Sequence, residues 1–257
     1  MRIRATGSMV FLAASMATVS ASAEERMMDV APDGNWQYEL GLGFSYTAGN
    51  TDTSTLTVTG DAVRQTAKDK WHINGRALRS AADGVTRANQ LMLGTRYDRD
   101  LIERWFGFGQ ADFMRDRLAN VSARYSGYVG AGYHAVKSET NVFNVFAGIG
   151  YRNDSYIQAA MVAGADRTTY GTTEAMLGEE SSHVLSDTAT ANQRLVIYPN
   201  LGDRGERRVI FDSGIAVAIT KSLSLSATLG IRYNSDPGET YKRRDTTFVT
   251  GISYKVQ

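Results

Sequence analysis

The chain has 257 residues, a formal net charge of +1 and no cysteine. The nearly neutral charge gives no basic footprint for nucleic acid, and without cysteine there is neither a disulfide framework nor a thiolate metal site. After about the first thirty residues, no apolar run approaches the roughly 18 residues that a membrane-spanning helix requires.

The N-terminal segment has the three parts of a secretory signal peptide. Arg2 and Arg4 supply positive charge, Met9–Ala17 forms a short apolar core, and Ala21-Ser22-Ala23 is a small-residue cleavage site. A short buried or anchoring helix is the alternative interpretation. We expect residues 1–23 to be removed, so that the mature protein lies beyond the inner membrane of a Gram-negative cell.

The segment Trp36–Thr47 carries the first clear secondary-structure signal, because large apolar residues alternate there with small or polar ones. A period of two gives a β-strand one apolar and one polar face. We expect residues 24–35 to be a flexible lead-in and residues 36–257 to form one barrel domain. Alternation and turn signals place twelve strands at 36–47, 54–64, 71–79, 87–97, 105–114, 124–134, 142–152, 174–186, 188–198, 209–219, 223–234 and 245–256.

The last three of these strands are unusually long. Val209–Ile219, Leu223–Asn234 and Asp245–Val256 each alternate throughout, whereas ordinary globular strands have about five or six residues. At roughly 3.3 Å per residue and a tilt near 40°, such a strand rises about 30 Å, the thickness of a bilayer's hydrocarbon core. Every backbone amide in lipid must be paired within the protein. The sequence therefore predicts an all-β, transmembrane, antiparallel up-and-down β-barrel.

Two regions are ambiguous in the sequence. The strand at 105–114 has aromatic residues on both faces, and alternation is weak at 174–186 and 188–198. Residues 153–173 are compatible with a long loop or with an additional strand at 157–165. Membrane barrels of this class have even strand numbers, which favours twelve.

Twelve strands that begin and end in the periplasm divide the connections into two sets. The periplasmic turns are expected at 66–70, 98–104, 135–140, 186–188 and 220–222. The outer loops, most of them longer, are expected at 49–53, 80–86, 115–123, 153–173, 200–206 and 235–244.

Aromatic residues of the apolar phase gather near the strand ends. Those expected at the periplasmic rim are Trp36, Trp71, Trp105, Tyr97, Tyr133 and Tyr254. Those expected at the outer rim are Tyr46, Tyr125, Tyr151 and Tyr233. Two such rings are typical of the interfacial girdles of a membrane barrel. A periplasmic β-sandwich, the soluble alternative, gives no reason for this placement.

Several short motifs follow one another along nearly the whole mature chain. They are Trp36 with Gly41-Leu42-Gly43-Phe44-Ser45, Gly49-Asn50-Thr51-Asp52, Arg96-Tyr97-Asp98, Arg115-Asp116, Gly130-Ala131-Gly132-Tyr133, Arg232-Tyr233-Asn234-Ser235-Asp236-Pro237, and Asp245 with Gly251-Ile252-Ser253-Tyr254. In this order they resemble the YdiY-like family of salt-induced outer-membrane proteins. The resemblance implies an outer-membrane barrel of unassigned activity and carries over no catalytic residue. Gly251, Tyr254 and Val256 also resemble a barrel-assembly signal, from which the ending Val256-Gln257 departs because an aromatic residue is usual there.

Charged residues occupy the polar phase of many strands, which a barrel turns toward its lumen. Charges in a partly wet lumen need partners or water. A salt-bridged plug and a narrow wet channel for small solutes are equally compatible with this pattern. The candidate lumen-lining residues are Glu39, Asp61, Arg76, Arg96, Asp98, Asp112, Arg124, Arg152, Glu180, Asp212, Arg232 and Lys255.

The sequence predicts neither catalysis nor metal binding. His72, His134 and His183 lack the spacing of metal ligands, and Ser181-Ser182-His183 matches no motif of a barrel hydrolase. We therefore expect no enzymatic activity, no cofactor, and no catalytic or metal-binding residue.

The leading functional hypothesis is a structural or porin-like barrel that passes small solutes or ions. The family resemblance adds a link to salt or osmotic response. The alternative is a lipid hydrolase or protease with its site at the outer rim. The expected partners are outer-membrane lipid, lipopolysaccharide and the barrel-assembly machinery, without nucleic acid.

Overall fold

Twelve β-strands form one closed barrel in a computed structural model of the chain. Each strand is antiparallel to the strands before and after it, and β1 pairs with β12 to complete the ring. The predicted all-β, up-and-down barrel of twelve strands is therefore confirmed. The expected signal peptide and most of the lead-in lie outside the described residues, which are 32–47, 53–203, 205–236 and 243–256.

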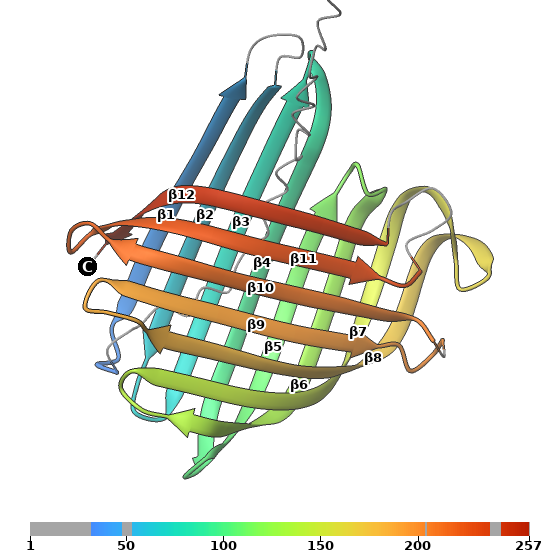
Figure 1. The fold of residues 1–257 in the computed structure, drawn as a ribbon. Helices are drawn as coiled ribbons and strands as arrows, with labels where there is room; N and C mark the ends of the chain where they lie inside the picture. Colours follow the sequence, from blue (N-terminus) through green and yellow to red (C-terminus); the bar gives the residue numbers. More distant parts are fainter. Residues whose placement is uncertain (1–31, 48–52, 204, 237–242, 257) are drawn as a thin grey trace, which may run out of the picture.

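The strands are long and strongly tilted. In Figure 1 the strands of the near wall, β9 to β12, run across the view, and the blue and green strands of the far wall rise steeply behind them. None of the described residues forms a helix long and apolar enough to span a membrane. The strand bounds are β1 Trp36–Thr47, β2 Thr53–Gln65, β3 Asp69–Ala82, β4 Val85–Ile102, β5 Trp105–Asp116, β6 Val121–Lys137, β7 Asn141–Val162, β8 Ala165–Val184, β9 Ala189–Pro199, β10 Arg207–Ala218, β11 Leu223–Asn234 and β12 Arg244–Val256.

The connections lie at two rims of the barrel. We call the end that carries Trp36 and Val256 the proximal rim, and the opposite end the distal rim. The connections at the proximal rim are 66–68, 103–104, 138–140, 185–188 and 219–222. Those at the distal rim are 48–52, 83–84, 117–120, 163–164, 200–206 and 235–243.

Several strands extend further than the sequence predicted, so their connections are shorter. The largest correction concerns residues 153–173, which form neither a long loop nor a separate strand. β7 continues to Val162 and β8 begins at Ala165. The two strands shift register between Ser155 and Ala160, and this irregularity interrupts the alternation on which the prediction relied.

Two distal hairpins close through two-residue turns, Asp83-Gly84 and Ala163-Gly164. All four residues have positive φ, namely 49° and 73° in the first turn and 50° and 71° in the second. Two consecutive positive φ angles are typical of a type I′ turn, whose twist matches that of paired strands. The longer outer loops predicted at 80–86 and 153–173 are therefore wrong, because local turn geometry allows the strands to continue to the hairpin tips.

The aromatic residues on the two faces of strand β5 lie in different environments. Trp105 is half exposed on the outer face, whereas Phe106 and Phe108 are buried in the interior. Successive side chains of a strand point to opposite faces, so one set of aromatic rings lies at the rim and the other fills the lumen.

The outer wall of the barrel is apolar. Leu42 is 68% exposed, Phe44 74% and Val129 63%. Ile215 and Leu225 are also exposed, as their alternation predicts. A continuous apolar exterior of this kind is suited to lipid, because water would leave it unfavourably solvated.

Aromatic rings of the outer face cluster at the proximal rim, as expected. The ring centroids of Trp36 and Trp71 are 5.7 Å apart, and those of Trp105 and Tyr133 are 5.2 Å apart. The Trp71 indole also donates a hydrogen bond to the hydroxyl of Thr95 at 2.8 Å. The side chain of Tyr46, which was assigned to the outer rim, lies outside the described part of the chain.

Replacing Val129 by arginine tests whether the outer wall lies in lipid. Val129 is midway along β6 between Tyr125 and Tyr133. An arginine there would sit near the bilayer midplane, so we expect V129R to lower the free energy of unfolding by about 2–4 kcal/mol in lipid vesicles. Urea titration followed by tryptophan fluorescence measures this change.

The matched control is Ile157→Arg on β7. Ile157 is also exposed but lies distal to Tyr151 on the same strand. We expect this variant to cost roughly 0–1 kcal/mol, the range for a position near the interface. Equal costs for the two variants would contradict the membrane placement.

Candidate permeation pathway

The barrel encloses two cavities, one toward each rim. The proximal cavity has a volume of about 390 Å³ and the distal cavity about 610 Å³. Arg194 and Asp212 line both cavities, so the two spaces meet at the level of these side chains. In the β9–β10 register Asp212 lies directly opposite Arg194.

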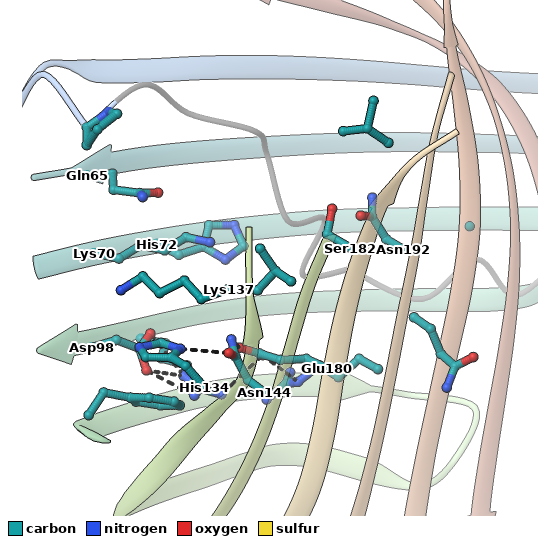
Figure 2. Close-up of a pocket in the computed structure, with 18 of the residues that line it drawn as sticks. Gln65, Lys70, His72, Asp98, His134, Lys137, Asn144, Glu180, Ser182 and Asn192 are labelled. Carbon is teal, nitrogen blue, oxygen red and sulfur yellow. Dashed lines mark hydrogen bonds and ion pairs between the residues drawn. The ribbon is translucent and has the colours of Figure 1, made fainter. Parts of the chain in front are cut away.

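A chain of hydrogen bonds runs along the wall of the proximal cavity, from β4 to β8. His134 Nε2 lies 3.0 Å from Asp100 Oδ1, and its Nδ1 lies 2.7 Å from Asn144 Oδ1. The Asn144 amide in turn donates to Glu180 at 3.1 Å. Figure 2 shows His134, Asn144 and Glu180 connected in this order. The chain links a carboxylate at the proximal rim to the layer that divides the cavities.

The dividing layer is built from charged side chains of β4, β8 and β9, of which only β8 and β9 are neighbours. Arg96 of β4 lies 3.7 Å from Glu180 of β8, measured from Nη1 to Oε2. Arg194 of β9 lies 3.9 Å from the same oxygen and donates to Gln110 of β5 at 3.4 Å. Because β4 and β8, and β5 and β9, are separated by several strands, the Arg96–Glu180 and Arg194–Gln110 contacts cross the interior, whereas Arg194 and Glu180 lie opposite each other along the β8–β9 wall.

Aromatic rings support the guanidinium groups of this layer. The Arg96 guanidinium lies 4.6 Å from the Phe108 ring centroid and 4.7 Å from that of Phe146, within the range of a cation–π interaction. Arg194 lies 5.6 Å from the Phe146 ring. Arginine stacked on aromatic faces is weakly hydrated and holds its position well, so the rings orient the charges that divide the lumen.

Glycines on the inner face make room for these rings. A Cβ added at Gly132 would overlap the Phe106 ring, and one added at Gly178 would lie 2.5 Å from the Phe146 ring. The tips of these rings therefore lie close to backbone that carries no side chain. The buried cluster comprises Phe106, Phe108, Tyr128, Phe146, Met176, Val196 and Tyr198, all from strands β5 to β9.

A buried ion-pair network lies beside the distal cavity. Arg152 is 1% exposed and contacts three carboxylates, Asp154 at 3.2 Å, Glu174 at 3.0 Å and Glu206 at 3.1 Å. Arg208 reaches Glu174 at 2.7 Å. Charges removed from water need partners of opposite sign, and this network supplies them over strands β7, β8 and β10.

Further hydrogen bonds complete the network. Arg124 contacts Asp154 at 2.5 Å, and the Tyr128 hydroxyl donates to Glu174 at 2.6 Å. Three arginines thus face three carboxylates with no net charge. This fully partnered arrangement is suited to a rigid wall.

The structure brings most of the predicted lumen residues into these features. Arg96, Asp98, Glu180 and Asp212 line the proximal cavity, and Asp112, Arg124, Arg152, Asp212 and Arg232 line the distal one. Arg232 pairs with Asp212 at 2.7 Å. The remaining four lie on β1, β2, β3 and β12: Asp61 contacts His72 at 3.0 Å, Arg76 is buried, and Glu39 faces Lys255 in the β1–β12 register.

Sequence reasoning missed some residues of the dividing layer and some of the Arg152 network. Glu174 and Arg194 lie on strands with weak alternation, and Glu206 and Arg208 lie beside a connection rather than in a predicted strand centre. Glu174 differs from the predicted Glu180 by an even number of positions, so strand parity could have found it. Glu206 carried no such signal.

The Ser181-Ser182-His183 sequence does not form a nucleophile–base pair. Ser182 lines the proximal cavity, whereas His183, the next residue in β8, points to the opposite face. His183 Nδ1 lies 2.8 Å from the amide oxygen of Asn141. Its place near the end of β8 is at the proximal rim, so the outer-rim site considered for a hydrolase does not include this histidine.

No metal site is evident among the side chains that the structure describes, since no three His, Asp or Glu residues gather so as to hold an ion. His72 and His134 instead contact Asp61 and Asp100. The arrangement of the lumen is that of paired charges rather than of a coordination sphere.

These features define a closed β-barrel with an apolar outer wall and a charged, partly filled lumen. The chain belongs to the DUF481 family, described as a protein of unknown function, whose model matches residues 40–256. It is 22% identical to the "Uncharacterized protein YdiY" of Escherichia coli strain K12 over 98% of each chain. The resemblance to YdiY-like proteins is therefore confirmed.

The chain is also similar to solved barrel structures. The translocator domain of autotransporter NalP from Neisseria meningitidis shares 12% identity, with coverage of 88% of this chain and 90% of that chain and a TM-score of 0.48. The KdgM porin in complex with disordered oligogalacturonate shares 9% identity, with coverage of 87% and 100% and a TM-score of 0.45.

Replacing Arg152 by methionine tests the role of the buried network. R152M removes a cation from among three carboxylates that stay buried. We expect the free energy of unfolding to fall by about 3–5 kcal/mol, because uncompensated buried charge is costly. The measurement is urea titration in lipid vesicles.

The control is Arg99→Met, which removes an arginine from an exposed pair. Arg99 lies 3.8 Å from Asp69, and its side chain is 62% exposed. Exposed pairs contribute roughly 0–1 kcal/mol, so this variant should unfold almost like the unmodified protein. A loss at Arg152 as small as that at Arg99 would show that the network contributes little.

Proposed function

We propose that this protein is an outer-membrane barrel through which small solutes or ions pass, and that it has no enzymatic activity. The observation that carries the proposal is the arrangement of two cavities, each lined in part by charged side chains, that meet at one charged layer. A solute that moves from one cavity to the other has to pass the side chains of Arg194 and Asp212, and Arg96 and Glu180 lie on the proximal side of this passage.

The membrane location is supported by the outer wall. Exposed aliphatic side chains cover the strands, and aromatic rings gather at the proximal rim, which is the pattern of a membrane barrel. With the expected signal peptide at residues 1–23, this pattern favours the outer membrane of a Gram-negative cell. The proximal rim would then face the periplasm, with the barrel-assembly machinery as a partner in folding and lipopolysaccharide around the distal half.

Geometry favours passage over a permanent seal at the dividing layer. The Arg96–Glu180 and Arg194–Glu180 distances are 3.7 and 3.9 Å, longer than the 2.7–2.9 Å of a tight charge-assisted hydrogen bond. One carboxylate is shared by two arginines, and Arg96 also contacts Asp98 at 2.9 Å, so a small rearrangement can move either arginine away from Glu180. The layer contains both signs of charge, which would admit small ions without strong selection.

Ionic strength offers a physical basis for a link to salt. The Debye length falls from about 8 Å at 0.15 M to about 3 Å at 1 M. Added ions screen the long pairs of Glu180 more readily than the shorter, more deeply buried contacts of Arg152. We propose that high salt loosens the dividing layer and increases passage, which would couple the barrel to osmotic conditions.

Planar-bilayer conductance of the refolded protein tests this function. The unmodified protein should give discrete currents, and Glu180→Gln should raise the single-channel conductance by a factor on the order of two, because both arginines lose their shared partner at the constriction. The preference for anions should also increase, since a negative charge is removed.

Glu139→Gln is the matched control. Glu139 lines the mouth of the proximal cavity in an exposed turn, away from the dividing layer, and its replacement should leave conductance unchanged. The absence of current in both unmodified and E180Q protein would contradict the proposal. If that silence were accompanied by detergent-dependent esterase activity of the unmodified protein, the alternative of a barrel hydrolase would be favoured.

A further inference from the structure

The seam between β1 and β12 is hydrogen-bonded over only part of its length. The two strands pair from Tyr38 opposite Val256 to Leu42 opposite Ile252, whereas β1 pairs with β2 along its whole length. In the described parts of both strands, β1 beyond Leu42 and β12 before Ile252 have no partner at this seam. Figure 1 shows blue β1 and red β12 leaving each other at a steep angle.

Two glycines stand at the point in the seam where the pairing stops. The residues next in register are Gly43 and Gly251, both on the lumen-facing phase. Among the described neighbours, a Cβ at Gly43 would meet only Thr57 of β2, at 3.6 Å, and one at Gly251 only Ser226 of β11, at 4.0 Å. Neither glycine approaches the opposite strand.

The two faces of the seam differ in polarity. On the outside, Leu42, Phe44 and Phe248 are exposed apolar side chains. On the inside, the adjacent wall carries the hydroxyls of Thr57 and Ser226. Free backbone groups of a strand edge are costly in lipid, but water on the hydroxyl-lined side can hydrate them.

On the opposite wall, ion pairs and hydrogen bonds between side chains hold the strands together, so these strands cannot separate in the same way. Glu180 links β8 to Arg96 of β4, and Glu174 links β8 to Arg208 of β10 and to Tyr128 of β6. These contacts hold β4 to β10 together as one unit. The seam lies outside this unit, so it can widen without breaking a buried ion pair of that unit.

We propose that the distal half of the β1–β12 seam is a lateral opening through which small apolar or amphipathic molecules move between the lumen and the outer leaflet. The chemical class follows from the two faces, since an apolar body fits past Leu42, Phe44 and Phe248 and a polar group can bond to the hydroxyls inside. The opening rests on the proposed outer-membrane location and adds a second exit to the axial passage.

Cross-linking the seam tests this opening. Phe44→Cys and Thr250→Cys place two thiols in register across the unpaired part, joined by a disulfide or by a longer bifunctional methanethiosulfonate. Leu40→Cys and Tyr254→Cys form the control, because these outward residues are already opposite each other in the paired part. Intact Gram-negative cells that express each variant are mixed with the apolar dye N-phenyl-1-naphthylamine, and planar-bilayer conductance is measured in parallel.

We expect dye uptake with the unmodified protein, and uptake at the level of cells lacking the protein once the Phe44→Cys/Thr250→Cys pair is joined. A reducing agent should restore uptake, conductance should not change, and the joined control should behave like the unmodified protein. No uptake with the unmodified protein, or undiminished uptake with a joined seam, overturns the lateral opening.

Two further results separate this inference from the proposed function. A cross-link between two copies in place of one within the chain overturns the opening, because it shows that a second copy covers the strand edge. Conductance without dye uptake removes the lateral opening and leaves the axial passage intact, whereas dye uptake without conductance removes the axial passage alone.

Discussion

Backbone hydrogen bonding is the constraint on which the rest of the structure depends. A strand in lipid can satisfy its amides only through two neighbouring strands, and a sheet without edges must close on itself. Twelve strands meet this requirement over most of their length. At the β1–β12 seam, however, pairing ends at Leu42 and Ile252. The last bond to close a ring of sequential hairpins joins the two ends of the chain, so this seam has no hairpin turn to fix its register.

Closure creates an interior that the sequence must then fill. A barrel of twelve strands is wider than one layer of side chains can occupy. Here the side chains that fill the interior come from strands β4 to β10. Phe106, Phe108 and Phe146 pack close to glycines, and arginines are paired with carboxylates. The wall formed by β1, β2, β11 and β12 carries mostly glycine and hydroxyl side chains. The side of the barrel formed by β4 to β10 is therefore filled with packed side chains, whereas the side formed by β1, β2, β11 and β12 carries small ones.

The alternation of inward and outward side chains along each strand made much of this fold predictable from sequence. The two-residue period of Trp36–Thr47 and of the three C-terminal strands depends only on which face meets lipid, and this is a local property. The same parity placed Arg96, Arg152 and Glu180 inside. Strand ends could not be found in this way, because β7 reaches Val162 through a register shift and a type I′ turn. The partners of the inward charges lay beyond sequence reasoning for a different reason. Arg96 meets Glu180 across the lumen, and such pairs depend on the tilt and stagger of the whole barrel rather than on neighbouring residues.

The Arg152 network and the pairs of Glu180 differ in burial and in the length of their contacts, and passage through the lumen would require such a difference. The Arg152 network is almost fully buried, and its contacts to Glu174 and to Asp154 are 3.0 and 3.2 Å long. Breaking it would leave buried charges without their partners, so it has to stay intact while solutes pass. The pairs of Glu180 are longer and border the proximal cavity. When Arg96 leaves Glu180 it keeps its 2.9 Å contact with Asp98, so this layer, rather than the Arg152 network, is the part of the lumen that can rearrange at low cost.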